Sequence, residues 1–176
     1  MKTTDASIRI SVPRQRLTLK QGRKRLRTFP ISTSRFGLGM EEGSFKTPTG
    51  RFRIAEKIGE GQPLNTAYKA RVPQPATREM LKSGDLVMSR ILWLDGLGRR
   101  NGNTYDRYIY IHGTNHEEQI GEPASHGCIR MRNADVAELF DLVSVGTPVV
   151  IAAPRPRRRA VNRARKALRE GCRLTK

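Results

Sequence analysis

The sequence predicts a mainly β domain, with a short helix near its C-terminal end and a basic tail behind it. Three observations carry this prediction: short apolar–polar alternations separated by turn residues, a nearly continuous apolar run at residues 86–94, and one apolar stripe at helical spacing. The chain has 176 residues, which suits a single domain at residues 1–153 and a tail at residues 154–176.

Alternating apolar residues predict short strands in the first half of the chain, because one face of a half-buried strand packs on the core. The alternating pairs are Ile8 and Ile10, Leu17 and Leu19, and Phe52 and Ile54. Gln21 and Gly22 predict a turn, and the proline-bounded residues 63–75 predict an irregular segment. Thr77 is the expected N-cap of a short helix that ends before Gly84.

The second half begins with the apolar run at residues 86–94, which predicts a buried strand. Residues 108–112 predict another strand, with Ile109 and Ile111 toward the core. Its other face would then carry Tyr108, Tyr110 and His112, pointing away from that core.

One helix and one strand complete the predicted domain. Asn133 is the expected N-cap of a helix at residues 134–143. Its apolar stripe consists of Val136, Leu139, Phe140 and Val143. Residues 148–153 predict the final strand, after a turn at Gly146.

The charge of the chain is strongly positive. It holds 34 Lys and Arg against 16 Asp and Glu, a formal net charge of +18, and residues 154–176 contain ten of those bases and a single acid, Glu170. Such a surface attracts anionic partners, namely nucleic acid, anionic lipid or acidic wall polymers. Nucleic acid is the least favoured of these, because no recognition motif and no interleaved aromatic residues accompany the arginines. A solvated extension without any partner stays open for the tail.

Cysteine content and hydropathy exclude several classes of protein. Cys128 and Cys172 are too few for a disulfide framework or a four-cysteine zinc site. No run approaches the ~20 apolar residues of a membrane-spanning helix. Residues 1–10 also lack the apolar stretch of a secretion signal.

Residues 125–130, Ser-His-Gly-Cys-Ile-Arg, carry the strongest chemical signal. A free thiol is mostly protonated at neutral pH, so a nucleophilic cysteine needs a nearby imidazole and positive potential. His112, His116 and His126 all lie within a few residues of this segment or of the strand before it. The glycine beside Cys128 allows close approach of a substrate carbonyl, and two successive backbone N–H groups there are candidate oxyanion donors.

The arrangement resembles the signature of the L,D-transpeptidase catalytic-domain family. The matching motifs are His-Gly-Thr at residues 112–114 and Ser-His-Gly-Cys-Ile-Arg at residues 125–130. The similarity extends to Thr-Pro-Thr-Gly at residues 47–50 and Ile-Leu-Trp-Leu at residues 91–94, and covers roughly residues 7–152. This resemblance implies a sandwich-like fold that brings the histidine and cysteine elements to one cleft.

The resemblance also assigns roles to individual residues. Cys128 is similar to the family's nucleophile and His112 to the base that takes its proton. The carbonyl of Gly113 would hold the imidazole of His112 in one tautomer. His126 is similar to the second motif histidine, with a structural or electrostatic role.

Further residues are expected to shape the site. Ser125 would order the cysteine loop, and the backbone N–H groups of Gly127 and Cys128 would bind an oxyanion. Arg130 is expected to bind a substrate carboxylate. Tyr110 and Thr47 are predicted to line the substrate site, although a tyrosine at such a position is more often a packing residue than a catalytic one.

The implied reaction is acyl transfer from a peptidoglycan tetrapeptide stem with release of D-alanine. An amine acceptor from a second stem would give a 3→3 cross-link, whereas water would give L,D-carboxypeptidase activity. The resemblance implies acylation by carbapenems, no cofactor and no metal, and a location in the periplasm or cell envelope. The basic tail would contact anionic wall or membrane by electrostatic attraction.

Two hypotheses from other classes remain open on the sequence alone. One is a catalytically silent basic protein that binds cell wall or nucleic acid. The other is a zinc hydrolase with ligands from His112, His116, His126 and Cys128, although zinc ligands usually show tighter paired spacing.

Overall fold

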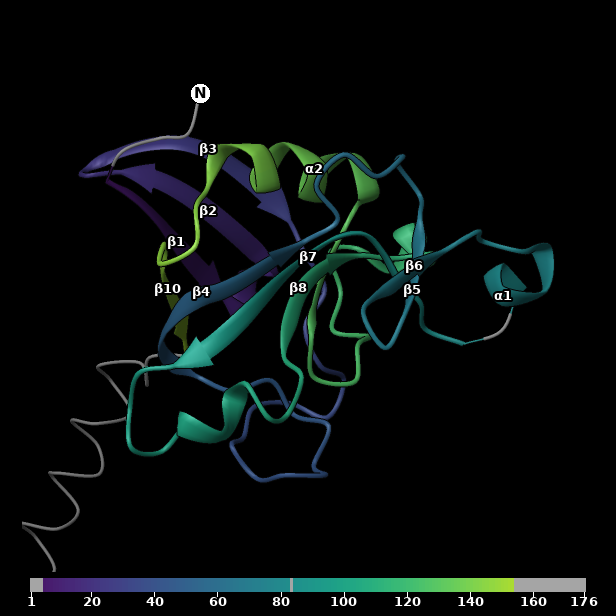
Figure 1. Cartoon of the computed structure of the whole chain (residues 1–176). Coiled ribbons are helices and arrows are strands. Elements are labelled where there is room, and N and C mark those ends of the chain that lie inside the picture. The colour runs from purple at the N-terminus through teal and green to yellow at the C-terminus, as the bar shows by residue number, and fades with distance from the viewer. Residues whose placement is uncertain (1–4, 83, 154–176) are drawn as a thin grey trace, which may run out of the picture.

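A computed structural model describes residues 5–82 and 84–153 of the chain (Figure 1). Its strands are β1 (Ala6–Ser11), β2 (Arg16–Gln21), β3 (Lys24–Pro30), β4 (Gly50–Ile58), β5 (Ala67–Lys69), β6 (Val72–Gln74), β7 (Val87–Gly96), β8 (Tyr110–Gly113), β9 (Ile129–Met131) and β10 (Pro148–Ala152). The helices are α1 (Arg78–Lys82) and α2 (Asn133–Leu142), with short 3₁₀ turns at Val12–Arg14, Gly102–Thr104 and Glu117–Gln119. The tail at residues 154–176, including Cys172, lies outside the described residues.

All of these strands belong to one branched sheet in the order β3-β2-β1-β10-β4-β7-β5-β6. At β7 the sheet branches, because β8 pairs with β7 and then with β9. Most neighbours are antiparallel, but β10 lies parallel to β1 and β9 lies parallel to β8. The predicted mainly β fold class, with a short helix after the cysteine, is confirmed.

The main hydrophobic core, which is mostly aliphatic, lies between the sheet and α2, and α2 packs against β7 and β8. Ile8 and Ile10 of β1, Leu17 of β2 and Phe52 of β4 are all buried there, as period-two alternation predicts. The predicted helical stripe from Val136 to Val143 is buried against the same core.

A second, smaller cluster occupies the other face of β7 and β8. It consists of Tyr68, Ile91, Trp93 and Tyr110, and Cys128 packs against it. Successive side chains of β8 therefore point alternately into the main core and into this second cluster, because side chains along a strand alternate between its two faces.

The segment predicted as irregular, residues 63–75, contains the hairpin of β5 and β6, so that prediction is wrong. Its turn residues, Ala70 and Arg71, have φ angles of 49° and 69°. Two-residue hairpin turns of this left-handed type are usually marked by Asn, Asp or Gly. The sequence therefore offers no turn signal at this position.

Two other predicted elements are present, but each starts at a different residue from the one predicted. The strand expected at residues 108–112 begins only at Tyr110, because Tyr108 adopts a φ of 55° and ends a turn. Asn133 is the first residue of α2 and not its N-cap. Its side chain is instead engaged in tertiary contacts with Ser89, Thr114 and Glu117.

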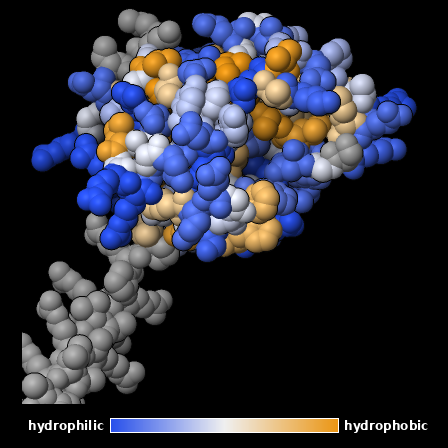
Figure 2. Space-filling model, turned by 60° about the horizontal axis from the view of Figure 1, so that its bottom comes forward, coloured by the Kyte–Doolittle hydropathy of each residue, from blue (hydrophilic) through white to orange (hydrophobic). Residues whose placement is uncertain are grey.

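The surface seen in Figure 2 is mostly hydrophilic, with separate hydrophobic patches. The large apolar side chains that are exposed include Phe36, Phe45 and Tyr108, which all belong to loops. Among the described helices, neither is long and apolar enough to cross a membrane.

Candidate active site

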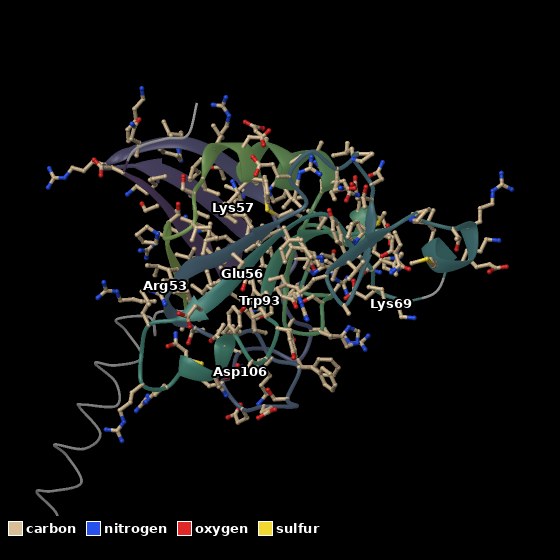
Figure 3. The ribbon with its side chains drawn as sticks, viewed as in Figure 1. Arg53, Glu56, Lys57, Lys69, Trp93 and Asp106 are labelled. Atoms are coloured by element: carbon tan, nitrogen blue, oxygen red, sulfur yellow. The ribbon has the colours of Figure 1, made fainter. Side chains whose placement is uncertain are left out.

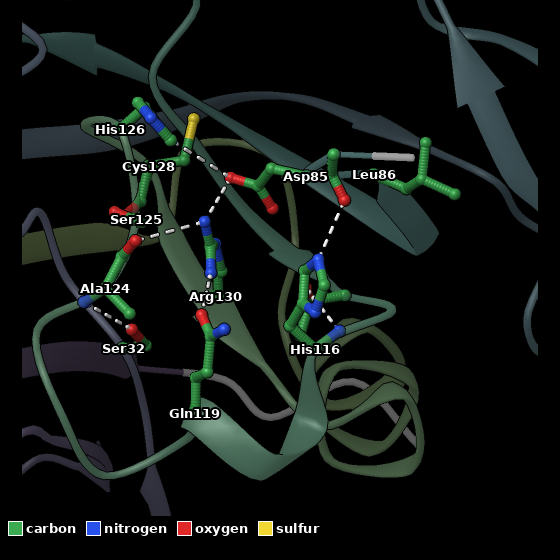
Figure 4. Close-up of polar contacts among 12 residues, drawn as sticks. Ser32, Asp85, Leu86, His116, Gln119, Ala124, Ser125, His126, Cys128 and Arg130 are labelled. Atoms are coloured by element: carbon green, nitrogen blue, oxygen red, sulfur yellow. Dashed lines mark hydrogen bonds and ion pairs between the residues drawn. The ribbon is translucent and has the colours of Figure 1, made fainter. Parts of the chain in front are cut away.

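Cys128 immediately precedes β9, at the edge of the aromatic cluster. The N–H of Tyr110 donates to its Sγ at 3.4 Å, and its thiol donates to the carbonyl of Tyr108, also at 3.4 Å. The thiol is thus held by the backbone that leads into β8. In Figure 4 its sulfur lies beside Asp85 and His126.

The parallel register of β8 and β9 positions the predicted base relative to this thiol. Ile111 pairs with Ile129, and His112 pairs with Arg130. Since paired residues share a face, Cys128 and His112 lie on the same side of neighbouring strands, on the diagonal. Among the described contacts, no hydrogen bond joins the two side chains.

His112 is buried, with 2% of its surface exposed. Its Nδ1 lies 2.6 Å from the carbonyl oxygen of Gly113. A carbonyl only accepts, so Nδ1 carries the proton and Nε2 keeps its lone pair. Gly113 has no room for a side chain, because a Cβ would lie 2.2 Å from Oδ1 of Asn133.

The loop before Cys128 is fixed by hydroxyl groups. The Ser125 hydroxyl donates to the carbonyl of Cys128 at 2.6 Å and accepts from the N–H of Gly127 at 3.3 Å. The hydroxyl of Thr47 donates to the carbonyl of Gly127 at 2.9 Å. Gly127 has a φ of 124°, a conformation that favours glycine.

A charged group that the sequence did not single out lies beside these residues. Asp85, in the loop between α1 and β7, pairs with the guanidinium of Arg130 and lies 3.7 Å from Nδ1 of His126 (Figure 4). Arg35 donates to Nε2 of His126 at 2.8 Å. His126 is therefore a partly exposed bridge between an arginine and a carboxylate.

The local environment keeps both reacting groups neutral at rest. Desolvation is the largest cause that raises the pKa of Cys128, to about 11; Asp85 adds to it, and the Tyr110 N–H and Arg130 oppose it. Desolvation also lowers the pKa of His112, with Asp85 opposing that shift. The resting pair is thus a thiol and a neutral imidazole.

Two residues that were predicted to bind substrate make hydrogen bonds within the protein instead. The side chain of Arg130 is 2% exposed and donates to Asp85, Gln119 and the carbonyl of Ala124. Thr47 is fully buried and fixes Gly127. Substrate contact by either residue stays a prediction, and the burial of both counts against it.

Comparison with known proteins identifies the family of this domain. The sequence profile of the YkuD family, described as the L,D-transpeptidase catalytic domain, matches residues 5–151. The chain belongs to this family. The family resemblance indicated by the motifs at residues 112–114 and 125–130 is therefore confirmed.

Relatives of this L,D-transpeptidase-family chain include YkuD of Bacillus subtilis strain 168, itself assigned by name to the L,D-transpeptidases. It is 30% identical over 145 residues, which cover 82% of this chain and 64% of YkuD. An L,D-transpeptidase from Mycobacterium smegmatis superposes with a TM-score of 0.55 at 20% identity, over 85% of this chain and 59% of that one. The LD transpeptidase LdtMt1, solved in complex with imipenem, gives 0.53 at 21% identity, over 84% and 59%.

Both solved structures share the fold of this chain, at identities too low to transfer more than the fold. The chain spans less than two thirds of the length of each of these relatives. The relatives thus establish the catalytic-domain family and its fold.

Metal ligation finds no support in the part of the chain that the structure describes, where no three His, Cys, Asp or Glu side chains converge. His116 is turned away from Cys128: its ring contacts the carbonyl of Gly84 at 2.8 Å and the carboxylate of Glu118 at 3.1 Å. The four-residue spacing from His112 to His116 therefore does not produce a shared site.

Sequence reasoning missed Asp85 and Arg107, which both act electrostatically on the Cys128 thiol. Arg107 donates to the carbonyls of Lys46 and Gly39 and is partly buried. Nothing in the local sequence marks Asp85 beyond its position after Gly84 and before the predicted strand. Its proximity to Cys128 depends on the tertiary fold.

Proposed function

We propose that this chain catalyses acyl transfer through a thioester on Cys128, as an L,D-transpeptidase acting on peptidoglycan stem peptides. The observation that carries the proposal is the β8–β9 register, which puts the Cys128 thiol and the His112 imidazole on one face. The hydrogen bond to Gly113 leaves Nε2 of that imidazole free to accept a proton. The family membership supports the same chemistry.

In the first step, Sγ attacks the carbonyl carbon of the third stem residue while Nε2 of His112 accepts the thiol proton. The tetrahedral intermediate collapses with cleavage of the carbon–nitrogen bond. His112 returns its proton to the departing amine, so that D-alanine leaves and a thioester forms. Asp85 favours the imidazolium that exists between these events, because it raises the pKa of His112.

The backbone of Cys128 supplies the best candidate for oxyanion binding. Its N–H has no acceptor among the described residues, whereas the Gly127 N–H donates to Ser125. Stabilisation of the oxyanion offsets the cost of ionising a thiol whose pKa is about 11. Attack and proton transfer are therefore expected to occur together.

The thioester is then resolved by an acceptor. Its nucleophilic atom attacks the thioester carbonyl, and His112 takes the acceptor's proton. The carbon–sulfur bond then breaks with its electron pair on Sγ, and His112 gives that proton to Sγ to restore the thiol. An amine of a second stem gives a 3→3 cross-link, and water gives L,D-carboxypeptidase activity. Product analysis with and without an added stem amine distinguishes these two outcomes.

The proposed substrate places the protein at the cell envelope or in the periplasm. Its charge supports an electrostatic contact with anionic wall or membrane, to which the tail would contribute. The described part of the chain also has a hollow lined by Arg9, Arg14, Arg16 and Arg25, with no acidic side chain in its lining. This surface belongs to the β1–β3 end of the sheet, away from β8 and β9 in strand order.

The test is intact-protein mass spectrometry after exposure to imipenem, combined with an assay for D-alanine release from a tetrapeptide stem. Wild type should gain one adduct and release D-alanine, while Cys128→Ala should do neither. Cys172→Ser is the matched control and should behave as wild type. A folded wild type with neither adduct nor D-alanine release would instead favour a non-catalytic basic binding protein.

A further inference from the structure

We propose that Arg71 binds the terminal carboxylate of the acyl-donor peptide and so selects donors that end in a free carboxylate. This inference rests on the proposed function and names a contact of the same site. The sequence assigned a carboxylate-binding role to Arg130, but that guanidinium is buried and paired with Asp85. Arg71 is partly exposed, and its guanidinium contacts Tyr108 and Tyr110, the two residues whose backbone holds the thiol.

The backbone holds Arg71 in an unusual position. It is the second residue of the two-residue turn between β5 and β6, and both turn residues have positive φ angles. Non-glycine residues in this region carry a conformational cost that surrounding contacts must offset. Here those contacts come from the aromatic side chains of Trp93, Tyr108 and Tyr110.

Three aromatic rings fix the guanidinium. Its central carbon lies 4.9 Å from the ring centroid of Trp93 and 5.1 Å from that of Tyr108, and it donates to the hydroxyl of Tyr110 at 3.4 Å. Trp93 is itself stacked on Tyr105, with centroids 4.1 Å apart. In Figure 3, Trp93 lies near the centre of the molecule, with Glu56 of the adjacent strand close by.

The partners of Arg71 connect it to the nucleophile. The N–H of Tyr110 donates to Sγ of Cys128, and the carbonyl of Tyr108 accepts from it. The same two tyrosines thus contact the thiol through their backbone and Arg71 through their rings. Arg71 and the thiol are therefore linked through the same two residues, Tyr108 and Tyr110.

Within the described residues, no carboxylate neutralises the charge of Arg71. Arg27, Arg53 and Arg130 each pair with a carboxylate. Arg71 has no such partner among residues 5–82 and 84–153, and its contacts are to neutral rings and a neutral hydroxyl. A guanidinium held by its faces keeps donors free at its edge for a planar anion.

The donor carries such an anion close to the scissile bond. The terminal carboxylate belongs to the leaving residue, and one extended residue spans only ~3.5 Å. A carboxylate bound at Arg71 would therefore position the preceding carbonyl within a residue's length of the anchored group. Charge-assisted hydrogen bonds to carboxylate are strong and can be bidentate, which fixes orientation as well as affinity.

The experiment measures D-alanine release from a tetrapeptide with a free C-terminus and alaninamide release from the same tetrapeptide with a C-terminal carboxamide. Wild type should prefer the free acid. Arg71→Gln should raise KM for the free acid by about tenfold or more, as expected for loss of a charge-assisted hydrogen bond, and leave the amide substrate nearly unchanged. Arg71→Lys should keep part of the preference, and Arg23→Gln, which removes an equal charge from the exposed turn between β2 and β3, should keep all of it.

Alkylation of Cys128 by iodoacetamide, which carries no carboxylate, reports whether each variant keeps an intact site. Unchanged alkylation with an equal loss on both peptides, or with no loss on either, would overturn the role of Arg71 while leaving the proposed function in place. If wild type releases neither product, the proposed function fails, and this inference fails with it.

Discussion

The two faces of β8 differ in chemistry although they share one strand. Ile111 points into an aliphatic core in which β1, β2, β4 and α2 pack together. Tyr110 and His112 point the other way, into a cluster that includes Trp93 and contacts Cys128. One face excludes polar groups, and the other places titratable groups where burial changes their pKa values.

This contrast shows how the fold separates stability from chemistry. Burial of aliphatic surface stabilises the domain without setting any proton equilibrium. Desolvation of His112 and Cys128, in contrast, sets proton equilibria. It lowers the pKa of the imidazole and raises the pKa of the thiol, so both groups are neutral although charged residues lie nearby. Substitutions on the reactive face should therefore change the rate of acylation, whereas substitutions on the core face should change the free energy of unfolding.

The largest effect is expected for His112→Gln on the reactive face. The amide can keep a hydrogen bond to Gly113 but cannot accept the thiol proton, so acylation by imipenem should slow by about 10²–10⁴-fold. Thermal unfolding should show that the domain stays folded. Acylation at the wild-type rate would mean that another group acts as the base.

On the aliphatic face, Leu139→Ala should lower the free energy of unfolding by about 2–5 kcal/mol, because it leaves a cavity in a fully buried site. Acylation per folded molecule should stay close to wild type. The control Leu97→Ala, at a side chain 51% exposed, should change stability by less than about 0.5 kcal/mol. A chemical defect in folded Leu139→Ala would show that the two faces are coupled.

Thr47→Val tests a contact that fixes the loop before Cys128. Loss of the hydroxyl leaves the buried Gly127 carbonyl without this donor, which should cost about 1–3 kcal/mol of stability. It should also slow acylation, because Gly127 orients Cys128. Thr104→Val removes a comparable buried hydrogen bond, to Asn101, and should lower stability alone. Equal kinetic effects of the two variants would contradict the positioning role of Thr47.

The smallest effect concerns pH. Burial lowers the pKa of folded His112 below its unfolded value of ~6.5, so its contribution to stability is present above that pH and is lost as the pH falls toward the folded pKa. The loss is at most about 1.4 kcal/mol per pH unit for this one proton. Urea unfolding at several pH values should show a steeper acid decline for wild type than for His112→Gln, and parallel curves would contradict this assignment.

Much of the fold follows from local patterns. The alternation at Ile8 and Ile10 and the stripe from Val136 to Val143 correctly predict which residues are buried, because period and burial are directly linked. The β5–β6 hairpin escaped prediction, since Ala70 and Arg71 form its turn without glycine or asparagine. The N-cap role of Asn133 was overridden by three tertiary contacts of its side chain.

The candidate site was predictable only in part. The motif at residues 125–130 and the strand at His112 locate the thiol and the imidazole, and the bond to Gly113 is present in the structure. Asp85 and Arg71 come from distant loops, and no sequence pattern links them to Cys128. Arg130 sits in the motif, but its partnership with Asp85 depends on long-range packing.

The neutral resting state of Cys128 is tested most directly by the pH dependence of its alkylation by iodoacetamide, followed by intact mass in a Cys172→Ser background. Iodoacetamide reacts with the thiolate, so the rate reports the fraction of thiol that is ionised at rest. Because the surroundings raise the pKa of Cys128 to about 11, the rate should keep rising through alkaline pH. A plateau already reached at neutral pH would show a preformed thiolate–imidazolium pair and would contradict the neutral resting site.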